Sequence, residues 1–189
     1  YPIEGSESLA RELIAMYEIG WRNFHVILCQ GHRFIGNGFG MDTEEVTIDV
    51  YGSVGDYLGS GNDGMTMHMH GNGQDQVGQI HKKGTLVVHG DVGQCYGYGA
   101  KGGRLFVLGN AAGRPMINSV GSPKLVINGT ALDYLAESCM AGDPLEGGGF
   151  VLINGIEFTP EGDIAAMETP YPGGNLFSLS SGGAIYVRD

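Results

Sequence analysis

The sequence predicts an all-β fold: a single-stranded right-handed parallel β-helix of about six or seven coils, preceded by a small N-terminal α/β cap. The first observation behind this prediction is glycine, which fills 35 of the 189 positions, against roughly 7% in an average protein. The second is regular spacing, because five glycines follow one another at intervals of 19, 19, 19 and 20 residues, each after a short strand-like run. A sixth such run also ends at a glycine. These coil glycines are Gly52, Gly71, Gly90, Gly109, Gly129 and Gly155.

The third observation is a pair of apolar columns aligned on the coil glycines. Residues two and four positions before each glycine are apolar in all six runs, and positions two apart in a strand share a face. A unit of about 19 residues is too short for a βαβ crossover, which takes about 30. The columns are therefore predicted to stack inside a coil of parallel strands. They are Ile48, Met67, Leu86, Leu105, Leu125 and Val151, and then Val50, Met69, Val88, Val107, Ile127 and Ile153.

The N-terminal segment, residues 1–41, is predicted to be the cap. Ser6 is a candidate N-cap for a helix that Gly20 ends, and two strands are expected after it, at 24–29 and 33–35. The helix would carry one apolar face made of Leu9, Leu13, Met16 and Tyr17.

Residues 42–189 are predicted to form the β-helix itself, with a loop insert at 156–172 and a last strand within 182–188. Corners between the strands are expected at further recurring glycines, because a corner favours a positive φ or a close approach of coils. These are Gly59, Gly78 and Gly97, and then Gly64, Gly84, Gly103, Gly121 and Gly142.

Charge and composition exclude several function classes. The formal net charge of −11 and the pI near 4.8, without a basic stripe, disfavour a nucleic-acid partner. No apolar run approaches the roughly 20 residues that cross a bilayer. The start has no secretory signal, and it lacks an initiator Met, which is compatible with a fragment of a longer chain. Three widely spaced cysteines, Cys29, Cys95 and Cys139, predict reduced thiols. We therefore expect a cytoplasmic protein that contacts neither membrane nor nucleic acid.

No catalytic or cofactor-binding residues are predicted. Two G-x-G-x-x-G matches, at 59–64 and 97–102, precede strands rather than helices, which argues against dinucleotide binding. Cys95 and Cys139 lie in predicted turns and have no neighbouring histidine or other base in sequence to activate them. His70 and His89 share a column, with His68 nearby on the same strand as His70. These three histidines are the only candidate metal ligands, and without a suitably spaced third ligand a surface ladder is favoured over a metal site.

An outward column changes character along the predicted rod. The residues three before the coil glycines are polar at Asp49 and His68 and then apolar in four successive coils. Such a stripe predicts a covered surface. The cover is either the chain's own insert or a partner, and the partner could be another copy of this chain. The stripe consists of Val87, Phe106, Val126 and Leu152.

These coils resemble the GXGXG domain, the β-helical C-terminal domain of the glutamate synthase large subunit. The resemblance covers residues 20–189 and rests on motifs in three segments, 90–97, 102–113 and 182–188; the segment 31–38 is similar to the entry of separately encoded versions. The chain departs from the family at Met116 and Ala136, which replace the mid-coil glycine, and in the insert at 156–172.

The resemblance implies a non-catalytic domain or subunit that supports the arrangement of glutamine amidotransferase and FMN synthase domains through which ammonia passes. It implies no cofactor on this chain, and FMN and iron-sulfur clusters on the partner domains. The same family includes one of the subunits of formylmethanofuran dehydrogenase, which gives a second interpretation. A stand-alone protein that binds metal or another ligand through the surface histidines is a third.

Overall fold

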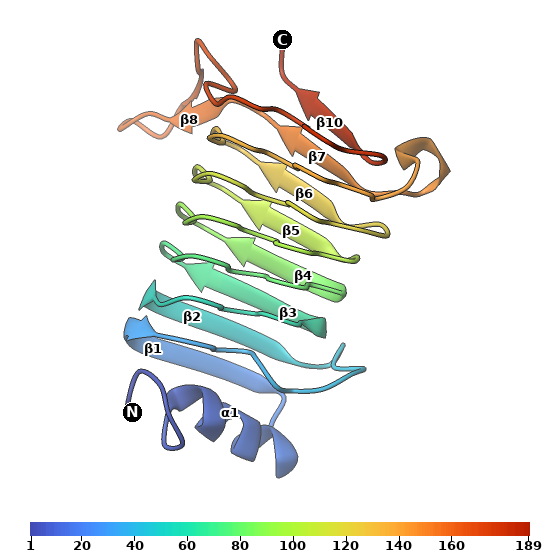
Figure 1. The fold of residues 1–189 in the computed structure, drawn as a ribbon. Helices are drawn as coiled ribbons and strands as arrows, with labels where there is room; N and C mark the ends of the chain where they lie inside the picture. Colours follow the sequence, from blue (N-terminus) through green and yellow to red (C-terminus); the bar gives the residue numbers. More distant parts are fainter.

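The computed structural model describes residues 1–189 and confirms the parallel β-helix. One sheet holds eight strands, each hydrogen-bonded in parallel to the next, and they climb the rod in sequence order (Figure 1). Five successive turns link β2 to β7, so the regular part is slightly shorter than the six or seven coils expected. The strands are β1 (Asn23–His32), β2 (Thr47–Val54), β3 (Asp63–His70), β4 (Lys83–Val88), β5 (Arg104–Val107), β6 (Lys124–Ile127), β7 (Phe150–Ile153) and β10 (Ala184–Val187).

The strand register confirms the two apolar columns. Met67 lies between Ile48 and Leu86, and Val88 lies between Met69 and Val107, so equivalent residues of successive coils stack directly. All twelve column residues are buried, the most exposed at 3%. Every second residue of a strand faces inward, so the columns form a continuous core along the rod.

A second ladder of main-chain hydrogen bonds joins the coils opposite the sheet. It runs through a segment of each coil in which every second residue has the left-handed conformation, with positive φ. Each coil has three residues, spaced two apart, with φ between 51° and 83°. In the coil after β3, the Gln76 and Ile80 N–H groups donate to the following coil, while the Gly78 N–H donates to the preceding one. The left-handed positions are 34, 36 and 38, then 57, 59 and 61, 76, 78 and 80, 95, 97 and 99, 114, 116 and 118, 134, 136 and 138, and 175, 177 and 179.

The family's missing glycines fall in this ladder. Met116 (φ 60°) and Ala136 (φ 51°) occupy the middle position of their sets and keep the left-handed conformation. Their N–H groups still donate to the preceding coil, to the carbonyls of Tyr96 and Pro115. A side chain at these positions therefore leaves the ladder intact.

The N-terminal cap is a helix packed over the first coil. Helix α1 (Leu9–Glu18) has Ser8 at its N-cap, so the helix begins two residues later than a Ser6 cap would give. Gly20 ends it as predicted: the Gly20 N–H donates to Tyr17 and the Trp21 N–H to Met16, which is the Schellman pattern. Leu13 is buried in the core, and the other residues of the predicted apolar face, Leu9, Met16 and Tyr17, pack against it.

Strand pairing begins inside the segment assigned to the cap. β1 pairs in parallel with β2 from Asn23 onward, and only residues 1–22 precede the sheet. The strand predicted at 33–35 is wrong, because those residues form a turn in which Phe34 is left-handed (φ 62°). The short apolar run there belongs instead to the first of the segments in which left-handed residues alternate with others.

None of the helices has the length and apolar character needed to cross a bilayer.

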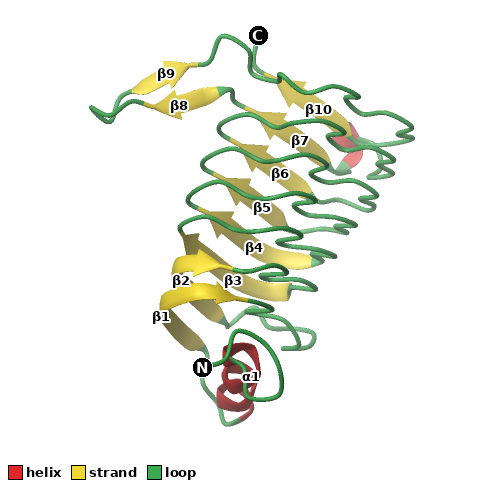
Figure 2. Ribbon diagram, turned by 60° about the vertical axis from the view of Figure 1, so that its left-hand side comes forward, coloured by secondary structure: helices red, strands yellow, loops and turns green.

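The insert forms an antiparallel hairpin of β8 (Ile156–Phe158) and β9 (Ile164–Ala166), which projects from the end of the rod (Figure 2). A short 3-10 helix, Pro144–Glu146, precedes β7.

Arg188 fixes the C-terminus against the insert, because its guanidinium donates to the carbonyl oxygens of Asn154, Gly155 and Met167 at 2.8, 3.2 and 2.7 Å.

Candidate functional site

The outer face of the sheet carries the residues that the sequence singled out. Register places the side chains of one outward column directly above one another from β1 to β10. The column is polar on the first three strands and apolar on the next four. It reads His25, Asp49, His68, Val87, Phe106, Val126, Leu152 and Tyr186.

The apolar half of this column is half-buried within the chain. Arg104 and Lys124 lie on one side of it, two residues earlier in their strands, and a ladder of Asn128 and Asn154 lies on the other, where the two amides are joined at 2.8 Å. Apart from its own pairing, the β8–β9 hairpin makes no extended contact with a strand of the sheet. That a partner covers the stripe of Val87, Phe106, Val126 and Leu152 stays a prediction.

The polar half holds a cluster of histidines. His70 Nε2 lies 2.8 Å from Asp49 Oδ1, and His68 Nδ1 lies 3.4 Å from His89 Nε2. Tyr51, His70 and His89 stack as a ladder, with ring centroids 4.3 and 4.5 Å apart. The pKa of His89 is lowered, first by partial burial and then by the neighbouring His70 and His68.

Stacking limits what the cluster can ligate. The rings of His70 and His89 lie within 27° of parallel, so their in-plane lone pairs do not converge on one point. Only His68 and His89 direct nitrogens toward each other. No group of three or more His, Cys, Asp or Glu side chains is placed to hold a metal ion. The arrangement fits a surface ladder on β2–β4 better than a metal centre.

The three cysteines are free thiols, and Cys29 Sγ lies 3.5 Å from His32 Nδ1. Burial raises the pKa of Cys29 and of Cys95, which keeps both protonated at neutral pH. Cys139 is buried and accepts a hydrogen bond from Ser119 Oγ at 3.1 Å. Because the thiolate is the reactive form, Cys29 and Cys95 are poor nucleophiles.

A buried histidine was not singled out by the sequence. His81 is fully buried at the corner before β4; its Nε2 lies 3.4 Å from the Gly84 carbonyl oxygen, and its Nδ1 has no partner. Burial lowers the pKa of His81 from 6.5 to about 4, against smaller raising effects of the Gly84 carbonyl and the Asp63 charge. The neutral ring is therefore the form that the fold requires.

Stability is expected to fall in mild acid because of His81. Its folded-state pKa lies below the unfolded one, so the stabilisation is complete above pH 6.5 and is lost as the pH falls toward 4. The difference corresponds to about 3 kcal/mol. Urea unfolding between pH 7.5 and 4.5 should show His81→Gln losing less stability than the wild type, whereas exposed His25→Gln should follow the wild type. Parallel wild-type and His81→Gln profiles would contradict this assignment.

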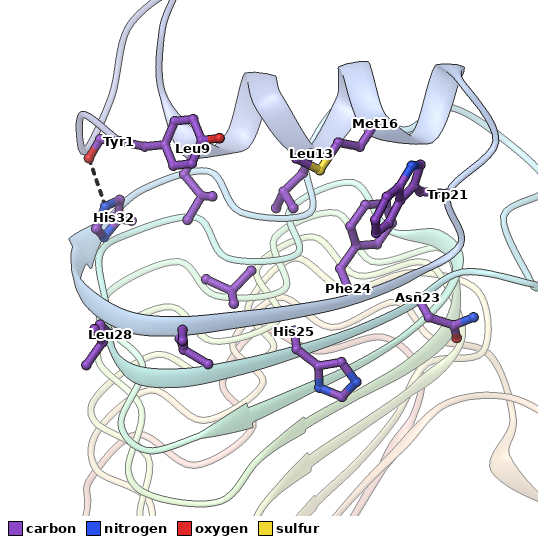
Figure 3. A pocket seen from close by; sticks show the side chains of 12 residues that line it. Tyr1, Leu9, Leu13, Met16, Trp21, Asn23, Phe24, His25, Leu28 and His32 are labelled. Carbon is purple, nitrogen blue, oxygen red and sulfur yellow. Dashed lines mark hydrogen bonds between the residues drawn. The ribbon is translucent and has the colours of Figure 1, made fainter.

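The largest pocket lies at the N-terminal end, between α1 and β1, with a volume of about 640 Å³. Leu9, Leu13 and Met16 of the helix form one wall, and β1 forms the other (Figure 3). The sequence prediction missed it, because it depends on how the cap sits over the first coil. The available signal was the unbroken apolar run of Val26, Ile27 and Leu28, which breaks the alternation of a half-buried strand.

The fold and its repeating corners define a parallel β-helix protein with an alternating left-handed ladder. In the comparison with protein families, the GXGXG motif model matches residues 30–189. The chain therefore belongs to the GXGXG motif family. Neither the curated proteins nor the solved structures gave a match.

Proposed function

We propose that this chain is a non-catalytic scaffold domain or subunit of a glutamate-synthase-like complex. The observation that carries the proposal is membership of the GXGXG motif family over most of the chain. The chain would hold an amidotransferase and an FMN-bearing synthase in the arrangement through which ammonia passes. FMN and iron-sulfur clusters would reside on those partners.

The outer face of the sheet supports a scaffold role. Four half-buried apolar side chains on adjacent strands form a row with a rise of about 4.8 Å per coil, fixed by the same ladder that holds the core. Arg104 and Lys124 beside the row would suit carboxylates on a partner. A partner that covers this row would be fixed relative to the whole rod.

Affinity purification of the tagged chain from its native host, followed by mass spectrometry, tests the identity of the partners. We expect stoichiometric amounts of an amidotransferase and an FMN synthase, or the same two domains if they belong to one longer polypeptide. Co-purification of formylmethanofuran dehydrogenase subunits instead would contradict the proposal and would assign the chain to that complex.

The stripe should be required for this assembly. Phe106→Glu with Val126→Glu should abolish co-purification of the partners, because two carboxylates would be buried in an apolar contact. Circular dichroism should stay unchanged, since both side chains face away from the core. Leu145→Glu with Leu179→Glu is the matched control, because both leucines are exposed, at 89% and 84%, and lie outside the sheet. Intact assembly of the stripe variant would exclude the stripe as the interface.

A further inference from the structure

The first strand of the sheet has an open main-chain edge. Alternate residues of a parallel strand direct their N–H and C=O groups to the same neighbour. The Thr47 N–H donates to the Arg22 carbonyl at 2.8 Å, and Asn23 is in register with Thr47. The main-chain groups of Asn23 and His25 therefore point away from β2, and neither residue makes a main-chain hydrogen bond on that side.

The same two residues line the apolar pocket between α1 and β1. The pocket therefore combines unpaired main-chain donors and acceptors with apolar walls from the helix. Exposed apolar side chains surround it: Trp21 is 56% exposed, Ile27 68% and Leu28 80%. Exposed apolar side chains gathered around one pocket are typical of an interaction site.

One end of the pocket is closed by the N-terminal segment. The Tyr1 carbonyl oxygen lies 3.1 Å from His32 Nε2 (Figure 3). His32 Nδ1 accepts from the Gln30 N–H at 3.1 Å, so Nε2 carries the proton and donates to Tyr1. The Arg33 N–H donates to the Ile3 carbonyl, and its guanidinium pairs with Glu4 at 2.7 Å. These contacts hold Tyr1 as a fixed wall and limit the length of an occupant.

We propose that a short extended segment of a partner chain binds here by adding a strand to the free edge of β1. Its main-chain groups would pair with those of Asn23 and His25, and alternate apolar side chains would lie against Leu13 and Met16. This mode of recognition takes affinity from main-chain hydrogen bonds and specificity from pockets for alternate side chains. A purely apolar small molecule would leave the same donors and acceptors unpaired.

Charge favours a segment with basic flanks. Residues 1–22, which form the cap over the pocket, carry four glutamates against two arginines, and the whole chain has a formal charge of −11. Like charges would also weaken pairing of β1 with β1 of a second copy. The site lies at the end of the rod and is independent of the stripe on β4–β7.

The chain's single tryptophan, Trp21, lines the pocket and reports its occupancy. The probes are seven-residue peptides with Lys at both ends and Val, Ile, Leu or Phe alternating with Thr between them. We expect a saturable blue shift of Trp21 emission. The same peptides N-methylated at alternate residues, which removes main-chain donors, should bind about tenfold more weakly. Equal binding of both sets, or no shift with any peptide, would overturn strand addition.

Protein variants separate the contribution of main-chain hydrogen bonds to peptide binding from that of the apolar pocket. His25→Pro removes an N–H that has no partner within the chain, and Pro is tolerated at such edge positions; peptide binding should weaken about tenfold. The His25 side chain lies on the outward face beside Asp49 and points away from α1 (Figure 3), so His25→Ala, which keeps the N–H, should bind the peptides like the wild type. Should His25→Pro disturb the circular dichroism spectrum, the N-methylated peptides carry the test alone.

Two further outcomes would replace the proposed occupant. A dimer in sedimentation velocity that His25→Pro dissociates would assign the edge to a second copy. Saturable binding of 8-anilinonaphthalene-1-sulfonate without peptide binding would assign the pocket to apolar small molecules. Phe106→Glu with Val126→Glu should leave peptide binding unchanged, so failure of the stripe proposal and failure of strand addition can be told apart.

Discussion

Val88→Asp is expected to unfold the protein at neutral pH. Val88 is fully buried in the second apolar column, between Met69 and Val107. The substitution removes an apolar side chain worth about 1.5 to 3 kcal/mol and buries a carboxylate with no cation nearby, which costs several kcal/mol more. Together these losses are comparable to the roughly 5 to 15 kcal/mol that stabilise a typical domain.

Val87→Asp is the matched control, because the same change is made one residue earlier on the outward face. Val87 is half-buried, and its variant should unfold within about 1 kcal/mol of the wild type. Urea titration followed by circular dichroism measures both variants. Equal effects of the two substitutions would mean that the strand faces are assigned the wrong way round.

Gly84→Ala is expected to have the second-largest effect, because it pushes neighbouring coils apart. Gly84 has φ +85°, and a Cβ there would overlap the Met65 carbonyl oxygen and lie 2.6 Å from the Gly64 carbonyl group. Both contacts are with main chain of the preceding coil, which cannot move without disturbing its own ladder. We expect a loss of about 3 kcal/mol or more, the sum of a left-handed alanine and a displaced backbone.

Gly61→Ala isolates the first part of that cost, the left-handed conformation of an alanine. Gly61 has a similar φ of +75°, but a Cβ there would meet nothing within 4 Å. Its variant should lose only the roughly 1 to 2 kcal/mol of a left-handed non-glycine residue. Differential scanning calorimetry of both variants makes the comparison. Equal melting temperatures would show that conformation alone, and not the approach of coils, selects glycine at position 84.

The strand register was predictable because repetition amplifies a weak signal. A single run such as Leu105 to Leu108 is ambiguous, whereas six runs aligned on a glycine fix both faces of every strand. The alternating left-handed ladder was not predictable to the same degree, because Tyr57, Gln76 and Cys95 adopt positive φ without being glycine. Their conformation is imposed by hydrogen bonds to adjacent coils rather than by local preference.

The candidate sites also differ in how far the sequence could predict them. Register alone brought the stripe and the histidine ladder onto one face, as the sequence predicted. The pocket required the position of α1 relative to β1, which is set by packing of Leu13 and Phe24 in the core and has no repeat to reveal it. His81 was missed because a lone histidine at a corner resembles any surface polar residue until its burial is known.

The alternating ladder also determines the order in which the coils open during local unfolding. Because Gly78 donates backward while Gln76 and Ile80 donate forward, a middle coil is tied to both neighbours, and opening it breaks bonds on two sides. A terminal coil has such bonds on one side only. With coupling limited to nearest neighbours, local opening should begin at the ends and move inward. Amide hydrogen exchange should therefore be slowest in β4 and β5 and become faster toward both termini.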